Sequence, residues 1–296
     1  MNAINDKQLV IEKPIIVNDV SKVEVFDFID DKYRVLIEDF YGRLRGNVSD
    51  DNLLSFYLNI GNLEIIDKYN LFTFLKSFIT EGSYDFRNNR ISIYSSKYKY
   101  SDIINHELLH MSTRKILDNK CHIGFLQVQK DYYVGNALNE GYTEIMCKEL
   151  FPGYTFSYAY NYEIIISKII EEIVGKDRMC DLYFSSDLYS LMGILSNYNS
   201  VSNVKEFLML TDYISIPFYK RELVDNLIGV NNFIFETFTN YLVRSDRDIY
   251  SMENEYYMFV NTMFRIIDNI PYNRDIVGRN LEYNSEIYKS RIRKLC

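Results

Sequence analysis

Two of the three histidines in this chain lie four residues apart, in the sequence His106-Glu107-Leu108-Leu109-His110. On a helix, residues at this spacing share a face, so both imidazoles can reach one metal ion. Three protein ligands plus one open position for water form a catalytic zinc site. With so few histidines, a chance match has odds on the order of a few per thousand. The spacing therefore predicts a Zn²⁺-dependent hydrolase; the alternative is an ordinary helical histidine pair in a core or on a surface.

The third zinc ligand must come from elsewhere in the chain. His122 does not have the spacing of the metzincin pattern H-E-x-x-H-x-x-G-x-x-H, and the glycine of that pattern is missing, so we expect it not to be a ligand. Asp118 is expected at the end of the same helix, pointing the wrong way. Glu140 is predicted on a separate helix, from which it can approach the metal across a cleft. Glu144, one turn later, can accept the Nδ1–H of a ligand histidine.

His106-Glu107-x-x-His110 followed by Asn139-Glu140-Gly141-x-x-Glu144 resembles the gluzincin group of metallopeptidases. These enzymes combine H-E-x-x-H with a glutamate ligand on a following helix. The resemblance covers roughly residues 95–150, while the flanking regions resemble small zincin-like proteins of bacteria and phages only loosely. It implies a set of roles, with Glu107 as the general base, Asn139 and Glu144 as supports behind the ligands, and the Zn²⁺ ligands His106, His110 and Glu140.

Gluzincins commonly use a tyrosine or histidine to stabilise the oxyanion of the reaction. This chain has no spare histidine but has 27 tyrosines, so a tyrosine is the better candidate. Tyr133 precedes Glu140, and Tyr158, Tyr160 and Tyr162 follow the second helix. We favour Tyr160 or Tyr162 for this catalytic role. For any one of them the alternative is a packed aromatic side chain, because tyrosine is so common here.

The function predicted from these residues is a zinc metallopeptidase that hydrolyses peptide bonds of a peptide or protein substrate. Two alternatives use the same residues: a catalytically silent binding protein with a zincin fold, and a zinc hydrolase of a non-protein amide. Other catalytic patterns, such as G-x-S-x-G, the P-loop and G-x-G-x-x-G, are missing from the sequence.

Composition and charge exclude several classes of protein. The net charge of −8 and the short basic run at 289–294, expected to be a solvated helix end, argue against nucleic-acid binding. No apolar run is long enough to span a membrane. The N-terminus has no features of a secretory signal, which makes a cytoplasmic location the default. The four cysteines have no C-x-x-C spacing and are expected to be reduced thiols.

The elements that must position these residues are mostly helices, as few glycines and prolines interrupt the chain. Helices are predicted at 31–45, from about 50, at 63–79, 101–117 and 136–150, and almost throughout 154–296. Alternation at 90–94 predicts a strand, which either pairs with an extended substrate or is internal. The segment 118–135 is a connection with one possible short strand at 125–128. The fold class is α+β, mostly helical.

The resemblance adds a domain organisation to this pattern. It implies a zincin-like catalytic core at 86–152, with a small β-sheet and the active-site helix. Residues 1–85 form an N-terminal, mostly helical region. Residues 153–296 form a helical C-terminal lobe that completes the cleft.

Overall fold

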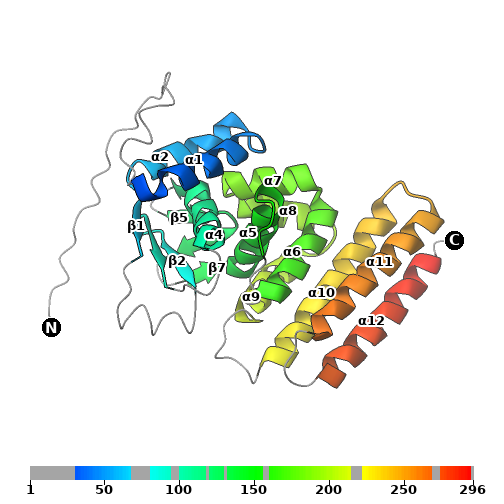
Figure 1. Ribbon diagram of the computed structural model, residues 1–296. Helices are drawn as coiled ribbons and strands as arrows, with labels where there is room; N and C mark the ends of the chain where they lie inside the picture. The colour runs from blue at the N-terminus through cyan, green and yellow to red at the C-terminus, as the bar shows by residue number, and fades with distance from the viewer. Residues whose placement is uncertain are drawn as a thin grey trace.

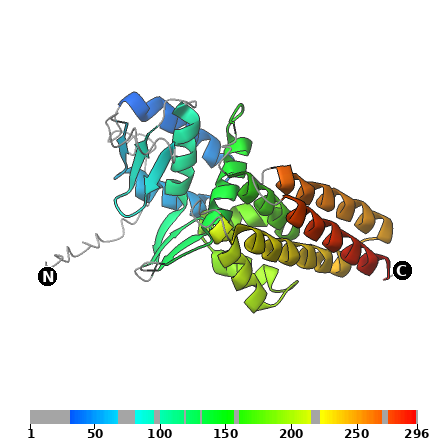
Figure 2. The same ribbon diagram turned by 90° about the horizontal axis from the view of Figure 1, so that it is seen from below.

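The computed structural model describes residues 31–67, 81–94, 100–117, 120–129, 132–155, 160–214, 222–268 and 274–294. Helices dominate these residues, and two small sheets accompany them, in agreement with a mostly helical α+β class. Both sheets and the first helices lie on one side of the molecule, and the three C-terminal helices lie on the other (Figures 1 and 2).

Helices α1 (Asp31–Arg45) and α2 (Asp50–Ile60) lie where the sequence predicted them. Tyr33, Ile37, Phe40 and Leu44 of α1 are buried in the core, while Val35 is exposed. Ser49 occupies the N-cap position of α2 without a side-chain hydrogen bond. Helix α2 packs against α4 (Tyr100–Thr113), the helix that carries the two histidines.

The first sheet has three strands in the order β1-β3-β2 and flanks α4. Strand β1 (Glu64–Ile66) pairs in parallel with β3 (Arg90–Ile93), and β2 (Gly82–Asp85) pairs with β3 in antiparallel register. The helix predicted at 63–79 is therefore wrong at 64–66, where β3 offers a pairing partner; residues 68–80 lie outside the described part of the chain. The strand predicted at 90–94 is confirmed, and it is internal.

The second sheet is an antiparallel meander that sequence analysis reduced to a connection. Helix α4 (Tyr100–Thr113) ends before the predicted Leu117, and its last residues continue directly into β4 (Arg114–Leu117). The other strands are β5 (Lys120–Ile123), β6 (Leu126–Gln129) and β7 (Tyr132–Val134). The possible strand predicted at 125–128 corresponds to β6, but β4, β5 and β7 were missed, because strands of three or four residues are too short to give a clear alternating pattern.

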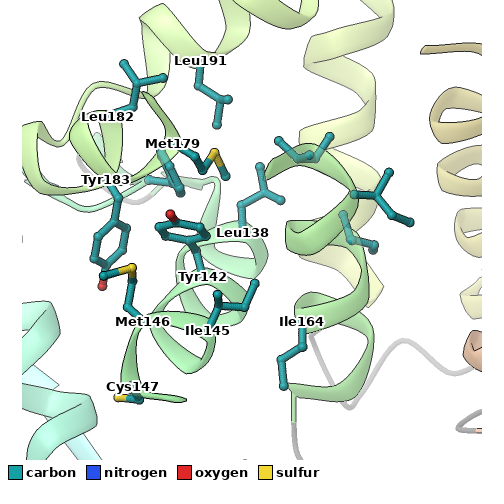
Figure 3. Packing of buried hydrophobic residues seen from close by; sticks show 14 of the residues in the cluster. Leu138, Tyr142, Ile145, Met146, Cys147, Ile164, Met179, Leu182, Tyr183 and Leu191 are labelled. Atoms are coloured by element: carbon teal, nitrogen blue, oxygen red, sulfur yellow. The ribbon is translucent and has the colours of Figure 1, made fainter. Parts of the chain in front are cut away.

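A run of helices follows, as predicted, beginning with α5 (Asn136–Leu150) at its expected bounds. The others are α6 (Asn161–Val174), α7 (Lys176–Ser185), α8 (Leu188–Leu195), α9 (Val201–Ile214), α10 (Leu223–Arg244), α11 (Ile249–Asp268) and α12 (Arg274–Arg293). One cluster of buried apolar residues extends from α1 to α12. Its part beside α5 joins residues of α5, α6, α7 and α8 (Figure 3), among them Leu138, Tyr142, Ile145, Ile164, Met179, Leu182, Tyr183 and Leu191.

Glycine allows α5 and α6 to approach closely. A Cβ atom on Gly141 would lie 2.1 Å from the carbonyl oxygen of Glu163, which is backbone and cannot move aside. A larger residue would therefore push the two helices apart. The close contact fixes the helix that carries Asn139, Glu140 and Glu144.

Candidate metal centre

Helix α4 separates its packing face from its chemical face. Ile104, Leu108 and Met111, at positions i, i+4 and i+7, are fully buried in the core. His106 and His110 lie one turn apart on another side of the helix, and both rings line a cavity. They are only 8% and 6% exposed, so little of either side chain is in contact with solvent.

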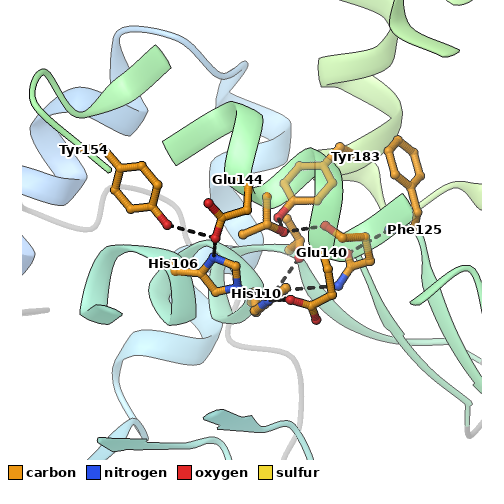
Figure 4. A network of polar contacts seen from close by, with 10 residues as sticks. His106, His110, Phe125, Glu140, Glu144, Tyr154 and Tyr183 are labelled. Carbon is orange, nitrogen blue, oxygen red and sulfur yellow. Dashed lines mark hydrogen bonds and ion pairs between the residues drawn. The ribbon is translucent and has the colours of Figure 1, made fainter. Parts of the chain in front are cut away.

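Helix α5 brings Glu140 to the two histidines (Figure 4). Glu140 Oε2 lies 3.2 Å from His106 Nε2 and 3.5 Å from His110 Nε2, and the two Nε2 atoms are 3.0 Å apart. Neighbouring ligand atoms of a tetrahedral zinc site, each about 2.1 Å from the ion, are about 3.4 Å apart. The three donor atoms therefore have the separations and the chemistry that zinc requires of three of its four ligands.

Glu144 supports the first histidine from behind. Its Oε1 atom lies 3.0 Å from His106 Nδ1 and also accepts a hydrogen bond from the Tyr154 hydroxyl at 3.0 Å. Burial alone would lower the pKa of His106, but hydrogen bonds with Cys147, Glu140 and Glu144 raise it well above its ordinary value. Tyr154 and Cys147 have no sequence signal that marked them as part of this site.

Asn139 links the second histidine to the turn between β5 and β6. Its Oδ1 accepts the backbone N–H of Phe125 at 3.1 Å, and its Nδ2 lies 3.1 Å from His110 Nδ1. The Asn139 side chain therefore joins the His110 ring to the backbone of this turn.

Glu107 lies between the histidines and strand β2. The backbone N–H of Tyr84 donates a hydrogen bond to its carboxylate, and Gly82 passes so close that an added Cβ would lie 3.1 Å from Glu107 Oε1. Burial raises the pKa of Glu107 above its ordinary value, although the nearby histidines oppose the shift. A raised pKa brings a carboxylate nearer to the range in which it exchanges protons at neutral pH.

Glu140 is held in its charged form despite its burial. Burial alone would raise its pKa, but the charge of His110 and the hydrogen bonds with both histidines hold the pKa far below its usual range. Glu140 thus remains an anion and can donate an oxygen ligand at all ordinary pH values. It raises the pKa of the neighbouring Tyr160, whose hydroxyl stays protonated.

The structure separates the two favoured tyrosines. The Tyr160 ring stacks on the His106 ring, with centroids 5.8 Å apart and planes 6° from parallel, and its hydroxyl is hydrogen-bonded to Glu140. Tyr162 does not line the cavity, and its buried hydroxyl has no hydrogen-bond partner among the described residues. Tyr133 lines the cavity. Tyr158 lies outside the described residues.

The cavity in front of the donor atoms has a volume of about 260 Å³. Both sheets and both helices contribute to its walls. Its lining residues are Gly82, Ser83, Tyr84, Phe86, His106, Glu107, His110, Ile123, Leu126, Tyr133, Asn136, Asn139, Glu140 and Tyr160.

The remaining candidates lie apart from this cluster. His122 is on β5, opposite Gln127 and Lys115, and does not contribute to the group of donor atoms. Asp118 lies outside the described residues. Cys121, Cys147 and Cys180 are free thiols, as expected, while Cys296 is not described.

Asp212 of α9 holds the start of the helix that carries Glu140. Its two carboxylate oxygens accept the backbone N–H groups of Gly135 and Ala137 at 2.8 and 2.9 Å. Burial raises the pKa of Asp212 to about 6, although these hydrogen bonds oppose the shift. Sequence analysis missed this contact because an aspartate within a helix gives no sign of a distant partner.

No helix in the described ranges is both long and apolar enough to cross a membrane. Comparisons with protein-family models, with curated proteins and with solved structures gave no match. What this site does is therefore inferred from its own geometry and chemistry.

Proposed function

We propose that this protein is a zinc-dependent metallopeptidase of the gluzincin type. The observation that carries the proposal is the convergence of His106, His110 and Glu140, whose donor atoms all lie within 4.8 Å of one another. Glu107, a carboxylate with a raised pKa, lines the same cavity. Two imidazoles and one carboxylate, with space left for water, make a catalytic rather than a closed structural zinc site.

In this mechanism each side chain of the site has a distinct role. When bound, zinc lowers the pKa of a coordinated water and polarises a carbonyl group. Glu107 accepts a proton from the attacking water and returns it to the leaving amine. The protonated Tyr160 hydroxyl donates a hydrogen bond to the oxygen on which negative charge develops. Glu144 and Asn139 orient the two histidine rings.

Strand β2 provides the backbone that an extended substrate would meet. In the described sheet it has a strand on one side only, and Gly82, Ser83 and Tyr84 line the cavity. An added peptide strand uses the free edge of a sheet for its hydrogen bonds. This role, considered for residues 90–94, is therefore assigned to β2, because β3 already has strands on both sides.

The decisive variant is Glu107→Gln. It keeps the shape of the side chain but removes the base, so we expect one zinc ion per chain and a loss of peptide hydrolysis by a factor of at least about 100. Glu149→Gln, on the outer end of α5, is the matched control and should leave hydrolysis unchanged. Metal content is measured by elemental analysis, and cleavage with a proteome-derived peptide mixture.

Three outcomes of this experiment would argue against the proposed function, each in a different way. Peptide hydrolysis that survives in Glu107→Gln would exclude the mechanism. Zinc binding without cleavage of any peptide would favour a silent binding protein or a hydrolase of a non-protein amide. If the purified protein bound no transition metal, the proposed metal centre itself would be wrong, and with it every function that depends on zinc.

A further inference from the structure

One wall of the cavity is apolar. It is formed by Phe86, Ile123, Leu126 and Tyr133, here called the apolar wall, and it lies in the same cavity as the metal-binding side chains. Phe86 follows β2, while the other three residues belong to the second sheet. The wall therefore joins the strand beside Glu107 to the sheet that follows α4.

Strand register explains why these side chains face the same way. Ile123 is directly opposite Leu126, and Val128 is directly opposite Tyr133. Residues directly opposite each other share a face of the sheet, as do residues two apart along a strand. Leu126 and Val128 are two apart, so Ile123, Leu126, Val128 and Tyr133 all lie on one face.

The apolar wall has its own support, separate from the main core. Ile123, Leu126 and Val128 form a second buried cluster, against which Phe86 and Cys121 pack. Arg114 donates from Nε to the carbonyl oxygen of Phe86 at 2.8 Å and from Nη1 to Asn59 Oδ1 at 2.7 Å. These bonds hold the backbone of Phe86 in place. They also engage the guanidinium group of Arg114 in contacts within the protein.

Part of the apolar wall is open to a ligand. The Tyr133 side chain is 45% exposed although its ring lines the cavity. Apolar area that a ligand covers is removed from water, which favours binding in proportion to that area. An apolar substrate side chain that covers the Tyr133 ring would therefore gain binding free energy.

Charge in the cavity points to the same kind of ligand. Among the described lining residues, the carboxylates are Glu107 and Glu140, and none is a lysine or arginine. An anionic substrate side chain against the apolar wall would lose water without gaining a counter-ion, and a cationic one could pair only with the carboxylates of the proposed metal ligand and base. An apolar or aromatic side chain has no charge to desolvate.

We propose that the apolar wall is the specificity subsite of this peptidase and selects substrates with a large apolar or aromatic residue next to the scissile bond. This inference rests on the proposed function and adds the class of substrate. Phe86 and Tyr133 are the specificity-determining residues, since they are the two members of the apolar wall that are not buried. Ile123 and Leu126 form its base.

The test uses internally quenched peptides that carry Phe, Leu, Lys or Asp on either side of the scissile bond. Wild-type protein is expected to cleave the Phe and Leu peptides at least roughly tenfold better, as kcat/KM, than the Lys and Asp peptides. Tyr133→Ala and Phe86→Ala should reduce this ratio, while Tyr133→Phe should keep it. Tyr189→Ala, which removes a ring 59% exposed on α8, is the control and should also keep the ratio.

A binding measurement separates failure of the subsite from failure of the proposed function. Fluorescence anisotropy of the same peptides on Glu107→Gln protein requires no catalysis. Cleavage that prefers Lys or Asp, or a ratio unchanged in Tyr133→Ala and Phe86→Ala, would overturn the subsite and leave the peptidase intact. If wild type cleaves no peptide, the proposed function fails. The subsite would still be supported if adding Tyr133→Ala to the Glu107→Gln protein weakened its binding of Phe peptides.

Discussion

His106 and Glu144 are joined at 3.0 Å between Nδ1 and Oε1, on the side of the imidazole ring opposite Glu140 (Figure 4). Glu140 and Glu144 are one helical turn apart on α5, so a single helix face contacts both nitrogens of one ring. Glu144 is almost fully buried, and Tyr154 holds its carboxylate in place. The ring of His106 therefore has one orientation, with Nε2 directed at the site.

Replacing Glu144 tests this support directly. In Glu144→Gln the side chain keeps its size but loses its charge, so it accepts the Nδ1–H of His106 more weakly. We expect zinc affinity to fall about 10- to 100-fold, as for other partners of metal-bound histidines. Competition with a chromogenic chelator measures the affinity. Glu149→Gln is the control, and equal affinities of the two variants would show that Glu144 does not support the metal.

The two helices of the site could be predicted from sequence because their signals are local. The spacing of His106 and His110 places both on one face of a helix, and Glu140 and Glu144 repeat the same spacing on the next. Gly141 was part of the motif, but its close contact with α6 was not predicted. These residues needed only the helical period to be placed.

The rest of the site depends on contacts between distant segments. Strands β4 to β7 are too short to show a period, although Gly124 and Gly135, at φ of +52° and +82°, mark two of their ends. Strand β2 was missed for the same reason, and with it the support of Glu107 by Tyr84. Tyr154 and Asp212 reach the site from other helices or turns, and no pattern within their own segments predicts a partner.

The Tyr160 hydroxyl is expected to matter for the rate of hydrolysis rather than for folding. Tyr160→Phe removes one oxygen from the cavity, and loss of a single donor to a developing oxyanion typically lowers kcat about 100-fold or more. Tyr162→Phe is a matched control, because it removes the same atom from a neighbouring tyrosine outside the cavity. Steady-state kinetics on one peptide separate kcat from KM. If both variants lost activity equally, Tyr160 would have no special role.

Gly82 determines how closely β2 approaches the base. A Cβ atom at this position would lie 2.6 Å from Ile103 Cγ2 and 3.1 Å from Glu107 Oε1, so Gly82→Ala must displace the strand, the Ile103 side chain or the carboxylate. A displacement of about 1 Å can cost about 100-fold in rate. We expect kcat/KM to fall by roughly this factor while zinc affinity is kept, since no ligand moves.

A control glycine distinguishes this effect from a general loss of stability. Gly193 of α8 has open space around it, so Gly193→Ala should keep activity and raise the free energy of unfolding by roughly 0.5–1 kcal/mol. Thermal unfolding of both variants accompanies the kinetics. Full activity in Gly82→Ala would show that β2 does not position Glu107.

Asp212, which holds the start of α5, makes the free energy of unfolding depend on pH. Because burial raises its pKa from 3.8 to about 6, the folded protein binds this proton more tightly than the unfolded chain does. The stability contributed by the proton is fully present below the unfolded pKa and is lost as pH rises through the folded pKa. Between about pH 5 and pH 7.5 we expect wild type to lose roughly 1.5 kcal/mol from this group.

Asp212→Asn isolates this contribution, because it cannot ionise but keeps a carbonyl oxygen for one N–H group of α5. Urea unfolding of both proteins at several pH values gives the difference in their free energies of unfolding, in which the other titrating groups cancel. The difference should shift in favour of the variant as pH rises. A difference that stayed constant would mean that the N–H groups of Gly135 and Ala137 stabilise the Asp212 anion as much as its burial opposes it. A shift in favour of wild type would mean that they outweigh the effect of burial.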